Sequence, residues 1–87
     1  MAKLKCFSID GVLLWFWSND HNPPHFHAKI EGAWEVAVCF QEPIEKMFKV
    51  RWSKKPFSSH HRKTLEQMVK EHRVELLKEW EEKVKSQ

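Results

Sequence analysis

The chain has few of the features that define secreted or membrane proteins. Its two cysteines, Cys6 and Cys39, are too few for a disulfide-dense secreted scaffold, and they do not form a C-x-x-C pair. The longest apolar stretch, Val12–Trp17, is far too short to cross a membrane, and no signal-type cleavage region follows it. We therefore expect a soluble protein of the cytoplasm with reduced thiols and no membrane partner.

Several signatures of enzymes and of repeat proteins are also missing. The chain has no Gly-rich phosphate-binding loop and no spacing of Ser, Cys and His that indicates a nucleophile motif. It has no internal repeats and no linker long enough to separate two domains. With 87 residues, the chain is expected to form a single domain over 1–87, so any function must lie on one small scaffold.

The first half of the chain predicts strands joined by turns. Polar and apolar residues alternate over Lys3–Phe7, Asp10-Gly11 is a strong turn signal, and Val12–Trp17 is rich in residues that favour strands. The segments "HFHAKI" and "WEVAVCF" then flank Glu31–Ala33. This arrangement predicts a hairpin with a three-residue loop, because that loop makes one face of the hairpin wholly apolar. The predicted apolar pairs are Ile30 with Trp34, Ala28 with Val36, and Phe26 with Val38; the predicted pairs on the other face are Lys29 with Glu35, His27 with Ala37, and His25 with Cys39.

The second half predicts one more strand and a long helix. Within "KMFKVRWS", Phe48, Val50 and Trp52 are expected on one side of a strand and Lys49 and Arg51 on the other. Ser58 or Ser59 is suited to cap a helix, whose apolar residues recur at three- and four-residue spacing. The stripe comprises Leu65, Met68, Val69, His72, Leu76, Trp80 and Val84, and His72 is expected to bond a strand or loop carbonyl. The fold class is therefore α+β, an antiparallel sheet of four to five strands packed against one long C-terminal helix.

Charge is unevenly distributed along the chain. The net charge is +3 at pH 7, yet residues 1–45 are net acidic, and every charged residue from Lys46 to Lys63 is basic. A basic segment together with aromatic residues on a strand, here Trp15 and Trp17, favours an anionic partner such as nucleic acid. Exposed Lys and Arg also occur as simple solvated surface. The candidate binding residues are Lys49, Arg51, Lys54, Lys55, Arg62 and Lys63.

The segment "NDHNPPHFH" (19–27) carries the chemistry of the chain. His25 and His27 are two residues apart on a predicted strand, so both imidazoles should project from one face while Phe26 points into the core. Zinc would need further ligands, which the rigid Pro-Pro corner and the hairpin can supply. The candidate metal ligands are His21, His25, His27 and Cys39, with Asp20 as an alternative to His21.

Two other interpretations of the same segment stay open. In the first, Asp20 and His21 only shape a turn, and His25 and His27 are partly exposed sheet residues without a ligand. In the second, the candidate catalytic residues His25, His27 and Asp20 supply acid-base chemistry while Lys49 or Arg51 holds a phosphate. The residue types alone do not decide among a metal site, a catalytic site and a structural corner.

Two stretches resemble a known family. "NDHNPPHFH" is similar to the N-D-H-x-P-P-H-x-H signature of the small bacterial DUF4160 family (a domain of unknown function), and "HRVELLKEW" (72–80) resembles the end of that family's helix. The resemblance covers nearly the whole chain and implies strands followed by a C-terminal helix. The family has no established activity. Its members are often encoded beside another small protein, which implies a toxin-antitoxin-like pairing.

We therefore predict a non-catalytic intracellular binding module, which could act in a regulatory or toxin-antitoxin-like pair. Its expected partner is nucleic acid, another protein or a second copy of the chain, bound on the sheet face with the histidines and basic residues. The chain has more tryptophans than we expect in this family, and these would suit a buried protein interface: Trp15, Trp17, Trp34 and Trp52. The alternative is a small histidine- or zinc-dependent enzyme that acts on a phosphodiester.

Overall fold

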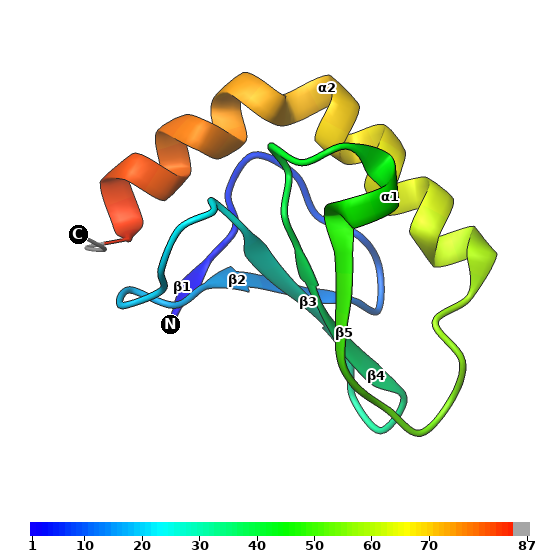
Figure 1. Ribbon diagram of the computed structural model, residues 1–87. Coiled ribbons are helices and arrows are strands. Elements are labelled where there is room, and N and C mark those ends of the chain that lie inside the picture. Colours follow the sequence, from blue (N-terminus) through cyan, green and yellow to red (C-terminus); the bar gives the residue numbers. More distant parts are fainter. Residues whose placement is uncertain (85–87) are drawn as a thin grey trace.

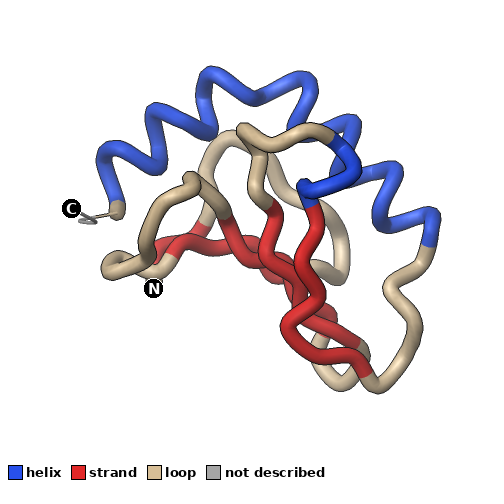
Figure 2. The backbone as a smooth tube through the Cα atoms, in the orientation of Figure 1, coloured by secondary structure: helices blue, strands red, loops and turns tan. Residues whose placement is uncertain are grey.

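The computed structural model describes residues 1–84 and contains a five-stranded antiparallel sheet with a long helix across one face (Figures 1 and 2). This confirms the predicted fold class. The strands lie side by side in chain order, so each pairs with its neighbours in the sequence. The elements are β1 (Ala2–Lys3), β2 (Leu13–Phe16), β3 (Phe26–Ile30), β4 (Trp34–Val38), α1 (Ile44–Met47), β5 (Phe48–Ser53) and α2 (Ser59–Lys83).

The β3–β4 hairpin has the register that its pattern predicts. Ile30 lies opposite Trp34, and His27 lies opposite Ala37, with the three-residue loop between the strands. Gly32 adopts a φ of +77°, a conformation that glycine enters without steric cost. The predicted pairing of His25 with Cys39 falls just outside the paired residues, since β3 begins at Phe26.

The first strand is shorter than predicted. Instead of Lys3–Phe7, β1 comprises only Ala2–Lys3, because the N–H groups of Lys5 and Cys6 donate to the side chain of Glu79 rather than to β2. The Asp10-Gly11 turn is present, and Gly11 has a φ of +77°. The N-terminal segment is thus held to α2 as well as to the sheet.

Strand β5 contains an irregularity that the alternation did not predict. Val50 pairs with Val36 but Trp52 pairs with Glu35, so Arg51 is an extra residue at a register shift. Because residues opposite one another share a face, Trp52 lies on the face of Glu35 and not on that of Val50. The expectation that Phe48, Val50 and Trp52 share one side was wrong.

Helix α2 begins as predicted and buries an apolar stripe. The Ser58 hydroxyl oxygen accepts the backbone N–H of His61 at 3.2 Å, which caps the helix. At His72 the backbone leaves helical geometry, with φ −121° and ψ 18°. Its Nδ1 lies 2.6 Å from Oε1 of Glu75, so the expected bond to a strand or loop carbonyl was wrong. The buried residues of α2 are Leu65, Val69, Leu76, Glu79 and Trp80.

The core lies between α2 and one face of the sheet. Phe16, Phe26, Val36 and Leu76 are fully buried there. We call the opposite face of the sheet the open face; it bears Leu13, Trp15, His27, Lys29, Glu35, Ala37, Lys49 and Trp52. Among residues 1–84, no helix combines the length and the apolar character needed to cross a bilayer.

Candidate functional site

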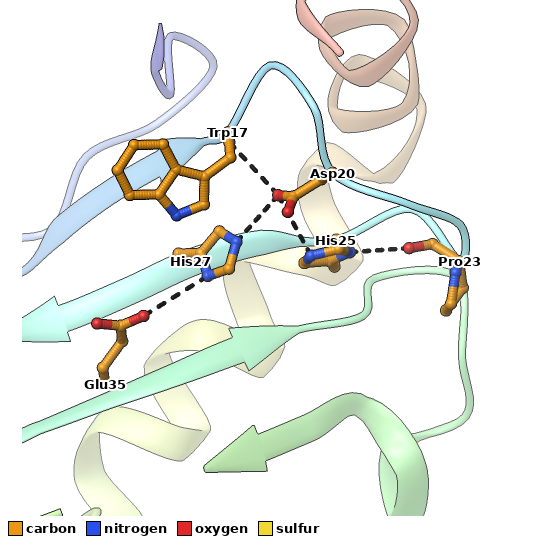
Figure 3. A network of polar contacts seen from close by, with 6 residues as sticks. All are labelled: Trp17, Asp20, Pro23, His25, His27 and Glu35. Atoms are coloured by element: carbon orange, nitrogen blue, oxygen red, sulfur yellow. Dashed lines mark hydrogen bonds and ion pairs between the residues drawn. The ribbon is translucent and has the colours of Figure 1, made fainter. Parts of the chain in front are cut away.

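The site is built at the corner where the chain leaves β2 and enters β3. Asp20 lies in the connecting loop, His25 immediately precedes β3, and His27 lies within it. Between the two histidines, Phe26 points into the core and is fully buried. Strand alternation puts the imidazole of His27 on the face opposite Phe26, and the rings of both histidines lie beside Asp20, as Figure 3 shows.

One carboxylate oxygen is the centre of the site. Oδ2 of Asp20 lies 3.0 Å from Nε2 of His27 and 3.3 Å from Nε2 of His25. The backbone N–H of Trp17 donates to the same oxygen at 3.4 Å. The carboxylate thus joins the end of β2 to the start of β3, and both histidine rings are oriented by it (Figure 3).

The other ring nitrogens of the two histidines face oxygen atoms as well. Nδ1 of His25 donates to the carbonyl oxygen of Pro23 at 2.9 Å. Nδ1 of His27 lies 3.8 Å from Oε2 of Glu35, beyond hydrogen-bond distance. It is buried and has no hydrogen-bond partner among the described residues. Each imidazole is therefore placed between two acceptors.

His27 is buried, contrary to the expectation of partly exposed histidines. Only 3% of its surface is exposed, because the Trp15 indole stacks on its ring with centroids 5.3 Å apart. This burial lowers the pKa of His27, although the nearby Asp20 carboxylate opposes the effect. His27 is thus neutral at pH 7. His25 is half-buried, and its ring lies 5.5 Å from that of Trp80 on α2.

A cleft of about 340 Å³ opens beside this cluster. Lys49 and Arg51 of β5 line one part of it, and the 20–25 corner lines another. The lining residues with ionisable side chains are Asp20, His21, His25, Cys39, Lys49 and Arg51. The cleft therefore places two cations near an imidazole, an arrangement suited to an anionic group.

The predicted binding residues do not form one continuous strip. Only Lys49 and Arg51 line the cleft, while Lys54 and Lys55 are exposed in the turn after β5. The guanidinium of Arg62 stacks on Phe48 and Phe57, at 5.1 and 5.3 Å from their ring centroids. Lys63 lies on α2 beside a different cavity, which α1 also lines.

The candidate metal ligands are likewise divided. Among residues 1–84, the group with atoms close enough to hold a metal ion is Asp20, His25 and His27, whose ligand atoms lie within 4.8 Å of one another. His21 and Cys39 line the cleft but are outside this group. Burial raises the pKa of the Cys39 thiol, with Lys49 acting in the opposite direction, so Cys39 is a thiol at neutral pH.

Trp15 and Glu35 were expected on the same sheet face as the histidines, but their contacts with His27 were not predicted. Trp15 covers one side of His27, and Glu35 faces its Nδ1. The hairpin pattern placed Glu35 on the correct face, and that was the available signal. The stacking of Trp15 on His27 had no local signal, because the loop between β2 and β3 is too long to set their register.

Fold and site together define a small α+β domain with an Asp-His-His cluster at the edge of a basic cleft. A family model described as Domain of unknown function (DUF4160) matches residues 11–81, and the chain belongs to this family. The match includes all the residues of the cluster and of the cleft. No curated protein and no solved structure matches the chain significantly.

Proposed function

We propose that this domain is a non-catalytic module that binds single-stranded nucleic acid on its open face. The observation that carries the proposal is the pairing of Lys49 and Arg51 along one side of the cleft. Both residues are exposed, so their positive charges remain available to phosphate groups. Cation contacts to the backbone supply most of the sequence-independent affinity of nucleic-acid binding.

Two exposed tryptophans on or beside the open face support the same proposal. Trp17 is 42% exposed and contacts the ring of Trp15, while Trp52 is 36% exposed and lies opposite Glu35. Aromatic rings beside a basic groove are the usual platform on which unpaired bases stack. The register shift in β5 is what puts Trp52 on this face together with Lys49.

The cleft is the first feature to test. Changing both Lys49 and Arg51 to alanine should weaken binding of a fluorescein-labelled mixed-sequence RNA or DNA strand by about 10-fold or more. The slope of log affinity against log salt should also fall by about 1.4, since each lost phosphate contact contributes about 0.7 for a single strand. Fluorescence anisotropy over a range of salt concentrations measures both quantities.

Lys70 and Arg73 provide a matched control, because they are exposed on α2 and line a different cavity. The double alanine variant at these positions removes the same charge and should bind almost as tightly as the native protein. Equal losses in the two double variants would reject the cleft as the binding site. If the native protein binds no nucleic acid and instead sediments as a dimer or with a protein partner, the open face is a protein interface.

A second candidate function is supported by the position of His25. This imidazole lines the cleft together with Lys49 and Arg51, so an acid-base group lies near cations that can hold a phosphodiester. On this hypothesis, His25→Ala should abolish RNA cleavage while His60→Ala, a change at an exposed residue of α2, should not. If the native protein, purified free of contaminating nuclease, leaves labelled RNA intact, this catalytic function is excluded. Action in a regulatory or toxin-antitoxin-like pair stays a prediction.

A further inference from the structure

The Asp20, His25 and His27 cluster has the spacing of a metal coordination shell. The ligand atoms around a zinc ion lie about 2.1 Å from it, and at angles of 90–110° they lie about 3.0–3.4 Å from one another. The observed separations from Asp20 Oδ2 are 3.0 Å to His27 Nε2 and 3.3 Å to His25 Nε2. The ligand atoms of all three residues lie within 4.8 Å of one another, so a closing movement of the side chains would let one ion contact all three.

Proton counting separates a metal site from an ordinary hydrogen-bonded cluster. A carbonyl oxygen only accepts, so the 2.9 Å contact of His25 Nδ1 with Pro23 O places a proton on that nitrogen. Nε2 of His25, which carries no proton in a neutral ring of this tautomer, lies 3.3 Å from Asp20 Oδ2 as a charge contact and not as a hydrogen bond. A second proton on the ring or a cation between the two atoms would supply the positive charge that this contact needs.

The same count applies to His27. Its Nε2 lies 3.0 Å from Asp20 Oδ2, and its buried Nδ1 lies 3.8 Å from the Glu35 carboxylate. If the one proton of the neutral ring is on Nε2, the Nδ1 lone pair faces the negative charge of Glu35. If it is on Nδ1, the Nε2 lone pair faces Asp20. The two rings thus face four acceptors with only two protons in their neutral forms.

A metal ion would resolve both conflicts at once. Metal-binding histidines commonly donate the N–H of the second ring nitrogen to a backbone carbonyl or a carboxylate. Pro23 O stands in that position for His25, and the Glu35 carboxylate faces the corresponding nitrogen of His27 (Figure 3). Both Nε2 atoms would then be free to bind the ion together with the Asp20 carboxylate.

We propose that Asp20, His25 and His27 form a binding site for a divalent transition-metal ion of the zinc type. Two imidazoles and one carboxylate suit zinc and related ions, whereas magnesium and calcium prefer oxygen ligands throughout. Asp20 and His25 also line the cleft, so an ion held by the cluster would lie beside it. This inference rests on the cluster alone and does not depend on nucleic-acid binding.

The test uses the full chain without an affinity tag, after treatment with a chelator. Titration calorimetry with zinc chloride should give one ion per chain, and cobalt(II) should produce visible absorption bands of a nitrogen- and oxygen-bound ion. Asp20→Asn and His25→Gln should each weaken zinc binding by about 100-fold or more, because even the partners of metal ligands contribute roughly 10- to 100-fold. Far-UV circular dichroism verifies that both variants are folded.

Two control variants identify the ligands. His21→Gln and Cys39→Ser change residues that line the same cleft but are outside the cluster, so both should bind zinc as the native protein does. Loss of binding in either control, with binding retained in Asp20→Asn, would overturn the proposed ligand set. Absence of stoichiometric binding by the folded native protein would also overturn the proposal.

Discussion

Replacing Phe26 with alanine should lower the free energy of unfolding by about 3–5 kcal/mol, the usual cost of truncating a buried phenylalanine. Phe26 is fully buried and packs edge-on against Phe7, with ring centroids 5.8 Å apart, and beside Phe40 at 6.3 Å. Small domains have a total stability of only about 5–15 kcal/mol, so much of the fold's stability would be lost. Urea denaturation followed by circular dichroism measures the change.

The position of Phe26 makes the same variant informative about the site. Because Phe26 lies between His25 and His27, its anchoring in the core is what holds the two imidazoles on the Asp20 side of β3. Val50→Ala is a suitable control, since Val50 is 52% exposed and should cost less than about 1 kcal/mol. If the two variants were equally stable, the assigned packing of β3 would be incorrect.

The β3–β4 hairpin could be predicted because its information is local. A three-residue loop and strict alternation leave one register in which Phe26, Ala28 and Ile30 all lie on the core face of the sheet. The same alternation placed His27 opposite Ala37 and Lys29 opposite Glu35. The same pattern put His27 on the face opposite Phe26, whereas His25 precedes β3 and its ring also lies near that of Trp80 on α2.

Features that depend on distant segments could not be predicted in this way. The burial of His27 requires Trp15, and the loop from Trp17 to His25 leaves the register of β2 against β3 undetermined by pattern. The register shift at Arg51 has no signal within "KMFKVRWS", whose alternation continues through it. The basic segment from Lys46 to Lys63 was likewise interpreted as a single surface. Arg62, at the start of α2, instead stacks on Phe48 of β5.

Glu79 is the clearest case of a residue whose role was hidden. Glutamate within a charged helix is expected on the solvent side, yet Glu79 is only 7% exposed. Its carboxylate accepts the N–H groups of Lys5 at 3.0 Å and Cys6 at 2.8 Å, together with the Lys83 ammonium at 2.6 Å. Glu79 thus joins the N-terminal segment to the end of α2, together with Lys83, which also donates to the Lys3 carbonyl oxygen at 2.9 Å. Nothing near Glu79 in the sequence indicates this role.

Changing Glu79 to glutamine should lower the free energy of unfolding by about 2–3 kcal/mol at neutral pH. The amide keeps the size of the side chain but loses its charge. Its carbonyl oxygen can still accept the N–H groups of Lys5 and Cys6 at the Oε1 position, but its NH₂ group would then face the Lys83 ammonium, which donates to Oε2 in the native protein. Removing a partner from buried charged hydrogen bonds leaves the other groups unsatisfied, which costs about this much. Glu82→Gln, an exposed change on the same helix, should cost less than about 0.5 kcal/mol.

The effect of the Glu79 substitution should also depend on pH. Burial by itself raises the pKa of Glu79, but the hydrogen bonds from Lys83, Lys5 and Cys6 outweigh it and hold the pKa below the usual 4.5. A carboxyl group with a lowered pKa in the folded state stabilises the fold fully above its unfolded pKa, and this contribution is lost as the pH falls through the folded value. The stability difference between native protein and Glu79→Gln should therefore be constant from about pH 7 to pH 5 and shrink below about pH 4.5. Urea denaturation of both proteins across this range measures it, and a difference that stays constant down to about pH 3 would mean that the Glu79 carboxylate does not provide the link.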